Sequence, residues 1–192
     1  MIRLVLASRN AHKIVELSRI APWVEWLPLA PELGDPPETG ATFEANALQK
    51  ARFVHEATGL WALADDSGLE VDALGGRPGV HSKRFSPEGR DDANNALLLA
   101  QLGARTDRTA RYRCVVALVG PGGEATAAGA CEGAIGVVAR GVGGFGYDPL
   151  FLPVATPGRT MAELSAGEKD TISHRGAALA GLPELLSRVG LR

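Results

Sequence analysis

The sequence is poor in cysteine and lacks any long apolar run. Cys114 and Cys131 are its only cysteines, too few for a thiolate zinc site, and their apolar neighbours favour small buried side chains over a disulfide. No window approaches the roughly 20 apolar residues of a membrane-spanning helix. The first residues also lack the apolar stretch of a signal peptide. We therefore expect a cytoplasmic protein that has no membrane partner.

An excess of charge of either sign is also missing. The chain carries 20 basic and 22 acidic residues, a formal net charge of −2. This balance gives no field strong enough to attract nucleic acid, so any recognition of phosphate must depend on a few placed groups. The P-loop motif Gly-x-x-x-x-Gly-Lys-Ser/Thr and the serine elbow of hydrolases are both missing. The sequence therefore predicts no nucleic-acid partner and does not support catalysis by a serine nucleophile.

The hydrophobic pattern predicts an α/β protein with a mixed sheet, because strands and helices alternate early and strands follow one another in the middle. The 192 residues fit one domain or two closely joined lobes, and no linker is long enough to separate independent domains. Helices are expected from residue 11 to about 22, from an N-cap at Thr42 to about residue 57 with Gly59 closing the helix, over 91–102, and from 165 to 188 with an interruption near 181–183. Strands are expected over 2–7, 60–64, 111–119, 124–139 and 150–154.

The turn from the first strand into the first helix carries a hydroxyl, an amide and cations, at Ser8, Arg9, Asn10, His12 and Lys13. A helix start presents unpaired N–H groups that bind anions, and such side chains hold phosphate oxygens through charge-assisted hydrogen bonds. Cations at a helix N-terminus oppose its dipole, so they cost stability unless an anion lies there. We favour a phosphate cradle at Ser8–Lys13 over a capped helix with a solvated basic first turn.

Two adjacent aspartates, Asp65 and Asp66, follow the strand expected at 60–64. Open α/β folds bind ligands at the carboxyl ends of their strands. One carboxylate there could bind Mg²⁺, and a carboxylate near that ion could orient or deprotonate an attacking water. A plain Asx turn fits the local sequence equally well. Glu32, Glu38 and Glu44 are all possible second metal ligands, and their spacing does not choose among them.

A glycine loop at Gly141–Gly146 satisfies the pattern Gly-x-Gly-x-x-Gly. A dinucleotide site would need a helix to begin there, whereas an apolar strand is expected at 150–154, so we reject that interpretation. Phe145 or Tyr147 could stack on a base; the alternative is that both rings belong to the core, which is the usual place of Phe and less often that of Tyr. The density of glycine indicates close approach of the backbone to another group.

Basic residues continue in the C-terminal helical region, at Lys169, His174 and Arg175. Ser165-Ala166-Gly167-Glu168 matches a capping box, so a helix is expected to begin there. His174 and Arg175 would lie 100° apart on a helix and could face one cleft. A solvated helix face is the commoner explanation for such charges.

Six segments, spread in order along the chain, share their sequences with one known family. They are Ser8-Arg9-Asn10-Ala11-His12-Lys13, Glu38-Thr39-Gly40-Ala41-Thr42-Phe43-Glu44-Ala45-Asn46-Ala47, Ala64-Asp65-Asp66-Ser67-Gly68-Leu69, Leu74-Gly75-Gly76-Arg77-Pro78-Gly79, Gly143-Gly144-Phe145-Gly146-Tyr147-Asp148-Pro149 and Ile172-Ser173-His174-Arg175-Gly176. Together they resemble the inosine triphosphate pyrophosphatase family, whose members act on ITP, dITP and XTP. Each segment is weak evidence by itself, but six in register are specific.

The resemblance implies a Mg²⁺-dependent hydrolysis between the α- and β-phosphates, which releases a nucleoside monophosphate and pyrophosphate. It assigns Asp66 as metal ligand and catalytic base, with Glu38 the best-matching second ligand although Pro36-Pro37 alters its loop. It implies that Ser67 contacts substrate. The residues that would bind the triphosphate or the nucleoside are Ser8, Arg9, Asn10, Ala11, His12, Lys13, Phe145, Gly146, Tyr147, Asp148, Lys169, His174 and Arg175.

The same resemblance implies a fold and an assembly. The expected fold is an elongated mixed β-sheet flanked by helices, forming one pyrophosphatase domain over residues 1–192, with two lobes and the active-site cleft between them. A homodimer is expected. Two other functions remain open: a regulatory module that binds a nucleotide without cleaving it, and a pyrophosphatase for modified pyrimidine nucleotides.

Overall fold

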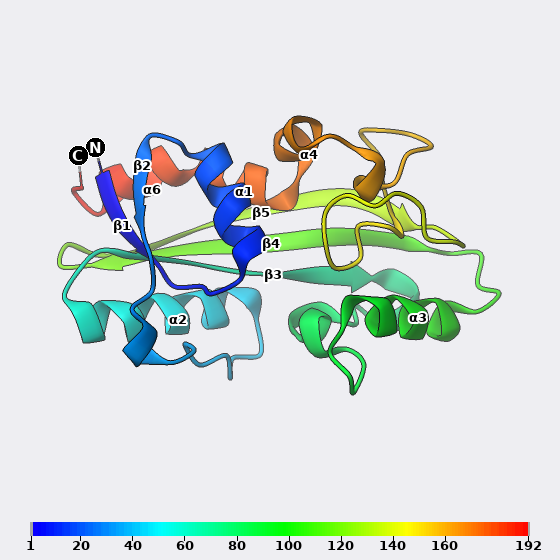
Figure 1. Cartoon of the computed structure of the whole chain (residues 1–192), viewed down its shortest axis with the longest axis horizontal. Helices are drawn as coiled ribbons and strands as arrows, with labels where there is room; N and C mark the ends of the chain where they lie inside the picture. Colours follow the sequence, from blue (N-terminus) through cyan, green and yellow to red (C-terminus); the bar gives the residue numbers. More distant parts are fainter. Residues whose placement is uncertain (1, 192) are drawn as a thin grey trace. The chain divides into compact units, whose positions relative to one another are not determined.

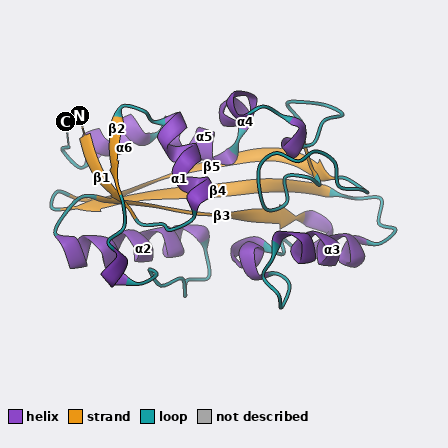
Figure 2. Cartoon of the chain, in the orientation of Figure 1, coloured by secondary structure: helices purple, strands orange, loops and turns teal. Residues whose placement is uncertain are grey.

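A computed structural model describes residues 2–191, which contain a six-stranded sheet with the strand order β2-β1-β3-β4-β5-β6 (Figure 2). The strand β1 pairs in parallel with β2 and β3, whereas β5 and β6 are antiparallel. The predicted mixed α/β fold is therefore confirmed. The strands are β1 (Ile2–Leu6), β2 (Val24–Leu27), β3 (Ala62–Val71), β4 (Thr109–Gly120), β5 (Gly123–Ile135) and β6 (Phe151–Pro153).

The strands differ from the sequence prediction mainly at β3. This strand runs unbroken through Asp65 and Asp66 to Val71, so the strand end expected at residue 64 is wrong, and so is the alternative of an Asx turn there. Both carboxylates can be buried within the strand because they have charged partners. The short strand β2 was not predicted. The strand β5 ends at Ile135 rather than near residue 139.

The three long helices lie where the hydrophobic period places them: α1 (Ala11–Ile20), α2 (Phe43–Thr58) and α3 (Asp91–Leu102). The C-terminal region forms three short helices, α4 (Ala166–Ile172), α5 (His174–Ala180) and α6 (Leu182–Arg188). The predicted break at Gly181 is confirmed, and a further break occurs at Ser173. Short 3₁₀ helices are η1 (Pro31–Leu33), η2 (Asp72–Leu74), η3 (Gly79–Arg84) and η4 (Met161–Glu163).

The chain forms two compact units, which are described separately. Unit 1 comprises Met1–Asp66, Cys114–Gly129 and Arg175–Arg192, and unit 2 comprises Ser67–Arg113 and Ala130–His174. The strands β3, β4 and β5 each contribute one segment to each unit. A single domain over 1–192 stays a prediction.

In unit 1, helices cover both faces of the sheet, with α1 and α6 on one face and α2 on the other (Figure 1). The side chains of β1 alternate accordingly. Leu4 and Leu6 pack in the cluster that includes Leu17 of α1, whereas Val5 packs in the cluster that includes Val54 of α2. Asp65 and Asp66 lie within β3, between these two layers, and both are buried.

The core of unit 2 is built around two tyrosines. Tyr112 of β4 and Tyr147 of the glycine loop pack with Leu98 of α3 and with Phe151 of β6. Tyr112 and Phe151 have ring centroids 4.5 Å apart. This core fixes the loop that precedes β6.

Both cysteines are buried thiols without a disulfide, as the sequence predicts. Burial raises the pKa of Cys131 to about 11, so this thiol stays protonated near neutral pH. Among residues 2–191, no helix is both long and apolar enough to cross a membrane.

Candidate active site

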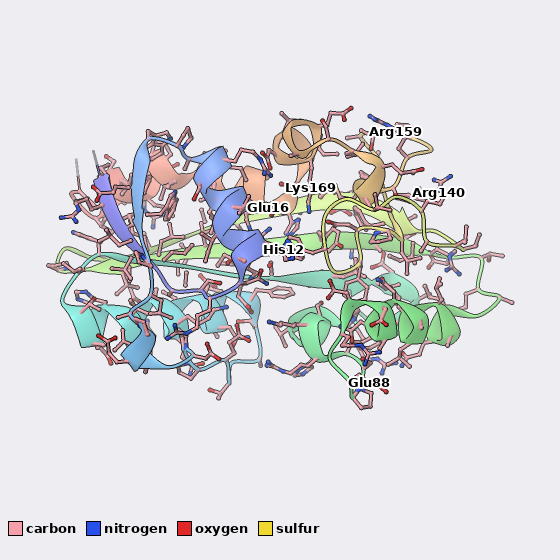
Figure 3. All side chains as sticks on the ribbon, viewed as in Figure 1. His12, Glu16, Glu88, Arg140, Arg159 and Lys169 are labelled. Carbon is pink, nitrogen blue, oxygen red and sulfur yellow. The ribbon has the colours of Figure 1, made fainter. Side chains whose placement is uncertain are left out.

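The start of α1 is capped by its own side chains. Asn10 Oδ1 accepts hydrogen bonds from the backbone N–H groups of His12 and Lys13, at 3.0 and 3.3 Å. Ser8 Oγ accepts from the N–H of Asn10 at 3.2 Å. His12 lies exposed in the first turn of α1 (Figure 3). The turn is thus held in a defined shape from within the segment Ser8–Lys13.

The cations of this segment are compensated. The guanidinium of Arg9 donates to the carbonyls of Ala30, Pro31 and Gly34 at 3.0–3.1 Å, and lies 3.3 Å from Asp35. Lys13 Nζ lies 3.0 Å from Asp65. Arg9 and Lys13 thus have anionic partners within the chain, so their charges at the helix start do not by themselves require a bound phosphate. These charges hold the surrounding chain, and their contact with phosphate stays a prediction.

Asp65 is the centre of a buried ion-pair network. Its Oδ2 accepts from Lys13 Nζ and from Arg175 Nη2, each at 3.0 Å, and Arg175 also pairs with Glu16. Glu16 lies on α1 (Figure 3). We call Asp65, Lys13, Arg175 and Glu16 the Asp65 network. Burial alone would raise the pKa of Asp65, but Lys13, Arg175 and then Lys50 together hold that pKa below its ordinary value. Asp65 is therefore ionised at neutral pH, and its carboxylate is held by ion pairs with Lys13 and Arg175.

Asp66, the next residue, has different partners. Its Oδ1 lies 3.0 Å from Lys50 Nζ, and its Oδ2 accepts from Asn46 Nδ2 at 3.1 Å. The same Lys50 ammonium lies 2.7 Å from Glu38 Oε1. We call Asp66, Asn46, Lys50 and Glu38 the Asp66 network. Burial raises the pKa of Asp66, and Lys50 opposes that shift only in part.

The helix α2 positions this network. Asn46 and Lys50 are four residues apart, so they lie on one face of the helix. Thr42 caps that helix by accepting from the N–H of Ala45 at 3.1 Å, as the sequence predicts. Asn46 also accepts from the N–H of Gly40 at 2.7 Å and thereby ties down the loop that carries Glu38.

The carboxylates available to a metal are those of Glu38 and Asp66. They converge on one ammonium, so their position already accepts a cation. Glu44 instead accepts a hydrogen bond from Thr126 at 2.9 Å. Within residues 2–191, no group of three or more His, Cys, Asp or Glu side chains could hold a metal. Mg²⁺ commonly takes one or two carboxylates and completes its shell with water and phosphate oxygens, so this pair fits it.

Asn46 and Lys50 were not predicted as site residues. Their position in the helix could have identified them, because α2 buries Ala47, Ala51 and Val54, and Asn46 and Lys50 lie on that same buried stripe. Polar side chains seldom occupy such a stripe unless they have partners. An amide and an ammonium there indicate a buried polar site nearby.

Asp148 organises the glycine loop of unit 2. It accepts from Tyr112 Oη at 3.1 Å, from the N–H of Phe145 at 2.9 Å and from Lys169 Nζ at 2.6 Å. A Cβ at Gly144 would lie 2.0 Å from the Asp148 carboxylate, so only glycine fits there. The close approach of backbone that the glycines indicate is therefore an approach to Asp148 at Gly144 and to the backbone of Ala162 at Gly141 and Gly143.

The two aromatic candidates differ in their surroundings. Tyr147 is buried, and its hydroxyl donates to the carbonyl of Ser82 at 2.7 Å, so its ring belongs to the core. Phe145 is half-buried, with Lys169 Nζ 4.7 Å from the centroid of its ring. Of the two, Phe145 is the better placed to meet a base.

The basic C-terminal residues do not form a solvated face. Lys169, His174 and Arg175 are 5%, 6% and 1% exposed, so the alternative of a charged surface is wrong. Lys169 comes from α4 (Figure 3), and the imidazole of His174 stacks on Tyr112 with centroids 4.7 Å apart. Ser67 is half-buried in β3 directly after Asp66.

The predicted residues thus fall into two groups. In unit 1 the structure connects Lys13 and Arg175 through Asp65, and Glu38 to Asp66 through Lys50. In unit 2 it connects Phe145, Asp148 and Lys169. Both groups are buried polar clusters of the kind that mark functional sites.

Residues 4–185 match the model of the Ham1 family, and the chain belongs to that family. It is 48% identical to a dITP/XTP pyrophosphatase of Geobacter sulfurreducens, with 100% of both chains covered. It is 52% identical to one of Mycolicibacterium paratuberculosis, over 92% of this chain and 91% of the relative. A solved HAM1 protein of Coxiella burnetii has a TM-score of 0.87 and 40% identity, with 97% and 99% covered. The family resemblance carried by the six segments is thereby confirmed.

Proposed function

We propose that this protein hydrolyses non-standard purine nucleoside triphosphates, dITP, XTP and ITP, to the nucleoside monophosphate and pyrophosphate. Relatives that carry the name dITP/XTP pyrophosphatase and align over nearly the whole chain support this activity. The observation that carries it is the state of Asp66, a buried carboxylate with a raised pKa beside a second carboxylate and an ammonium.

Asp66 is suited to act as a general base. Its raised pKa makes it a stronger proton acceptor than an exposed aspartate, and Asn46 fixes the orientation of its Oδ2. In the proposed step, Asp66 takes a proton from water while the water oxygen bonds to the α-phosphorus. The bond from that phosphorus to the bridging oxygen breaks, and its electron pair leaves with pyrophosphate.

We propose Mg²⁺ as the cofactor, with Asp66 and Glu38 as its protein ligands. When bound, the ion supplies charge neutralisation at the phosphates and lowers the pKa of a coordinated water. Lys50 balances the two carboxylates before the ion arrives. It also provides an ammonium beside them that can hold a phosphate oxygen.

The remaining residues are proposed to hold the nucleotide. Ser8–Lys13 would bind the triphosphate, and Phe145 would meet the base while Lys169 and His174 hold the nucleoside. A 6-keto group accepts a hydrogen bond where the amino group of adenine donates one, so donors placed there leave adenine mismatched. We also propose that the protein is cytoplasmic and forms a homodimer. The family resemblance supports the dimer, and sedimentation of the purified protein would test it.

A panel of triphosphates, assayed for pyrophosphate release with and without Mg²⁺, tests the activity. We expect rapid hydrolysis of dITP, ITP and XTP, slow hydrolysis of ATP and GTP, and none after the metal is removed with EDTA. ATP cleaved as fast as ITP would overturn the substrate class. Faster cleavage of modified pyrimidine nucleotides would favour the alternative pyrophosphatase.

A titration of Mg²⁺ in the same assay tests the ligand pair. Glu38→Gln should raise the Mg²⁺ concentration needed for half-maximal rate. Glu44→Gln is the matched control because Glu44 lies in the first turn of α2 but pairs with Thr126. Equal Mg²⁺ requirements in the two variants would remove Glu38 from the metal site.

A further inference from the structure

Gly146 joins two aromatic residues that have different surroundings. It has a φ of 64°, in the left-handed region that glycine adopts without strain. On one side of it Tyr147 is buried and donates to Ser82, and on the other Phe145 is half-buried beneath Lys169. The conformation at Gly146 therefore decides where the Phe145 ring lies relative to the core.

Both backbone polar groups of Gly146 are held by one helix. Its N–H donates to Asp91 Oδ2 at 2.6 Å, and its carbonyl accepts from Asn95 Nδ2 at 2.9 Å. Asp91 is the first residue of α3 and Asn95 lies four residues on, so the two side chains share one face of the helix. An acceptor and a donor at this spacing match the N–H and the carbonyl of a single residue.

The rest of the loop is held by other means. The N–H of Gly143 donates to the carbonyl of Ala162 at 3.0 Å, and the N–H of Phe145 donates to Asp148 at 2.9 Å. The contacts from α3 therefore fix the peptide groups on both sides of Gly146. Neither peptide can rotate without losing one of these hydrogen bonds.

We propose that Asp91 and Asn95 are positioning residues that lock the turn at Gly146 and thereby hold Phe145 in place for the nucleobase. The proposal rests on the proposed function only in that its ligand is a purine nucleotide. A site that binds a planar base is stronger when the side chain that contacts the base is fixed in advance, because ordering a loop during binding costs affinity. Asp91 and Asn95 would act through the backbone of Gly146.

The neighbouring residues of α3 provide a matched control. Asp92 is an exposed aspartate of the same first turn, but its carboxylate pairs with Arg90 at 3.1 Å. Replacing either aspartate with alanine removes one charge from the helix N-terminus, where negative charge is favourable. Only the change at Asp91 also removes the acceptor for Gly146.

The test compares Asp91→Ala with Asp92→Ala in steady-state kinetics on dITP. Losing the hydrogen bond should raise KM by about three- to tenfold, with kcat nearly unchanged, in Asp91→Ala alone. Asp91→Asn keeps an acceptor oxygen at the same place and should restore most of the affinity. Asn95→Asp keeps the shape but faces the Gly146 carbonyl with a carboxylate, so it should raise KM at least as much as Asp91→Ala.

Hydrogen exchange at the amide of Gly146 in the ligand-free protein gives a second measurement. The amide should exchange faster in Asp91→Ala than in the parent protein or in Asp92→Ala. Equal KM and equal exchange in the two alanine variants would overturn the proposal, as would an equal rise in KM in both. A parent protein inactive on every triphosphate would refute the proposed function, while the exchange comparison would still decide whether α3 locks the loop.

Discussion

Asp65 and Asp66 are adjacent in one strand and are both buried, yet their surroundings differ in charge. The Asp65 network surrounds its carboxylate with Lys13 and Arg175, which hold its pKa below the ordinary value. The Asp66 network gives its carboxylate one ammonium, shared with Glu38, and burial raises its pKa. The number of cations around each aspartate, rather than burial alone, decides the direction of its shift.

This difference gives Asp65 a structural role and Asp66 a chemical one. Asp65 is ionised and pairs with Lys13 and Arg175 through Oδ2, so it serves to hold α1 and α5 against β3. Asp66 pairs with one ammonium where Asp65 pairs with two cations, so Asp66 is the better placed of the two to accept a proton or bind a metal. Substitutions at the two positions should have opposite profiles in stability and catalysis.

The largest effect on stability should come from Asp65→Asn. This change leaves the buried Arg175 and the half-buried Lys13 without their shared anion, and breaking a buried pair in this way costs about 3–5 kcal/mol. Urea denaturation at neutral pH measures the free energy of unfolding directly. Asp66→Asn is the matched control, and an equal loss in both variants would contradict the division of roles.

The stabilisation that Asp65 supplies should also depend on pH with a definite sign. Because the folded pKa of Asp65 is depressed, its contribution is full above the ordinary aspartate pKa of about 4 and is lost as the pH falls through the folded pKa. The gap in unfolding free energy between the parent and Asp65→Asn should therefore narrow toward acid pH. A difference in unfolding free energy that widened toward acid pH would contradict a depressed pKa for Asp65 in the folded protein.

A smaller effect is expected from Lys50→Met on the pH profile. Lys50 lowers the pKa of Asp66, so its removal should raise that pKa further. The acidic limb of kcat/KM, which reports ionisation of the base, should move to higher pH. Lys83→Met is the control, because this exposed lysine carries the same charge and lies in unit 2. An acidic limb that stayed in place would show that another group limits activity.

Local features of the fold were predictable from sequence because they depend on neighbouring residues. Thr42 and Ser165 cap helices through bonds that span three residues, and the helical period of α3 is contained in its own segment. The long extent of β3 was not predictable. Arg175 stabilises Asp65 from 110 residues away, and no local pattern announces such a partner.

The candidate site divides in the same way. The six motifs contain Asp66, Glu38 and Asp148, and the family resemblance also implied Lys169, which lies outside them; the structure adds how these side chains are connected. Chemistry alone did not predict that Arg9 would hold a loop, because its carbonyl partners at Ala30, Pro31 and Gly34 carry no side-chain signature. The burial of Tyr147 was not predictable for a similar reason, because the partner of its hydroxyl is the backbone carbonyl of Ser82.

The most direct test is Asp66→Asn, measured both for turnover of dITP and for binding of dITP in the presence of Ca²⁺ by calorimetry. Loss of a general base should lower kcat by about 10²–10⁴-fold, while the nucleotide still binds and the folded protein stays about as stable as the parent. This outcome would also exclude a module that only binds nucleotides, provided that the parent cleaves. Full activity in Asp66→Asn would contradict the assignment of Asp66 as the reacting carboxylate.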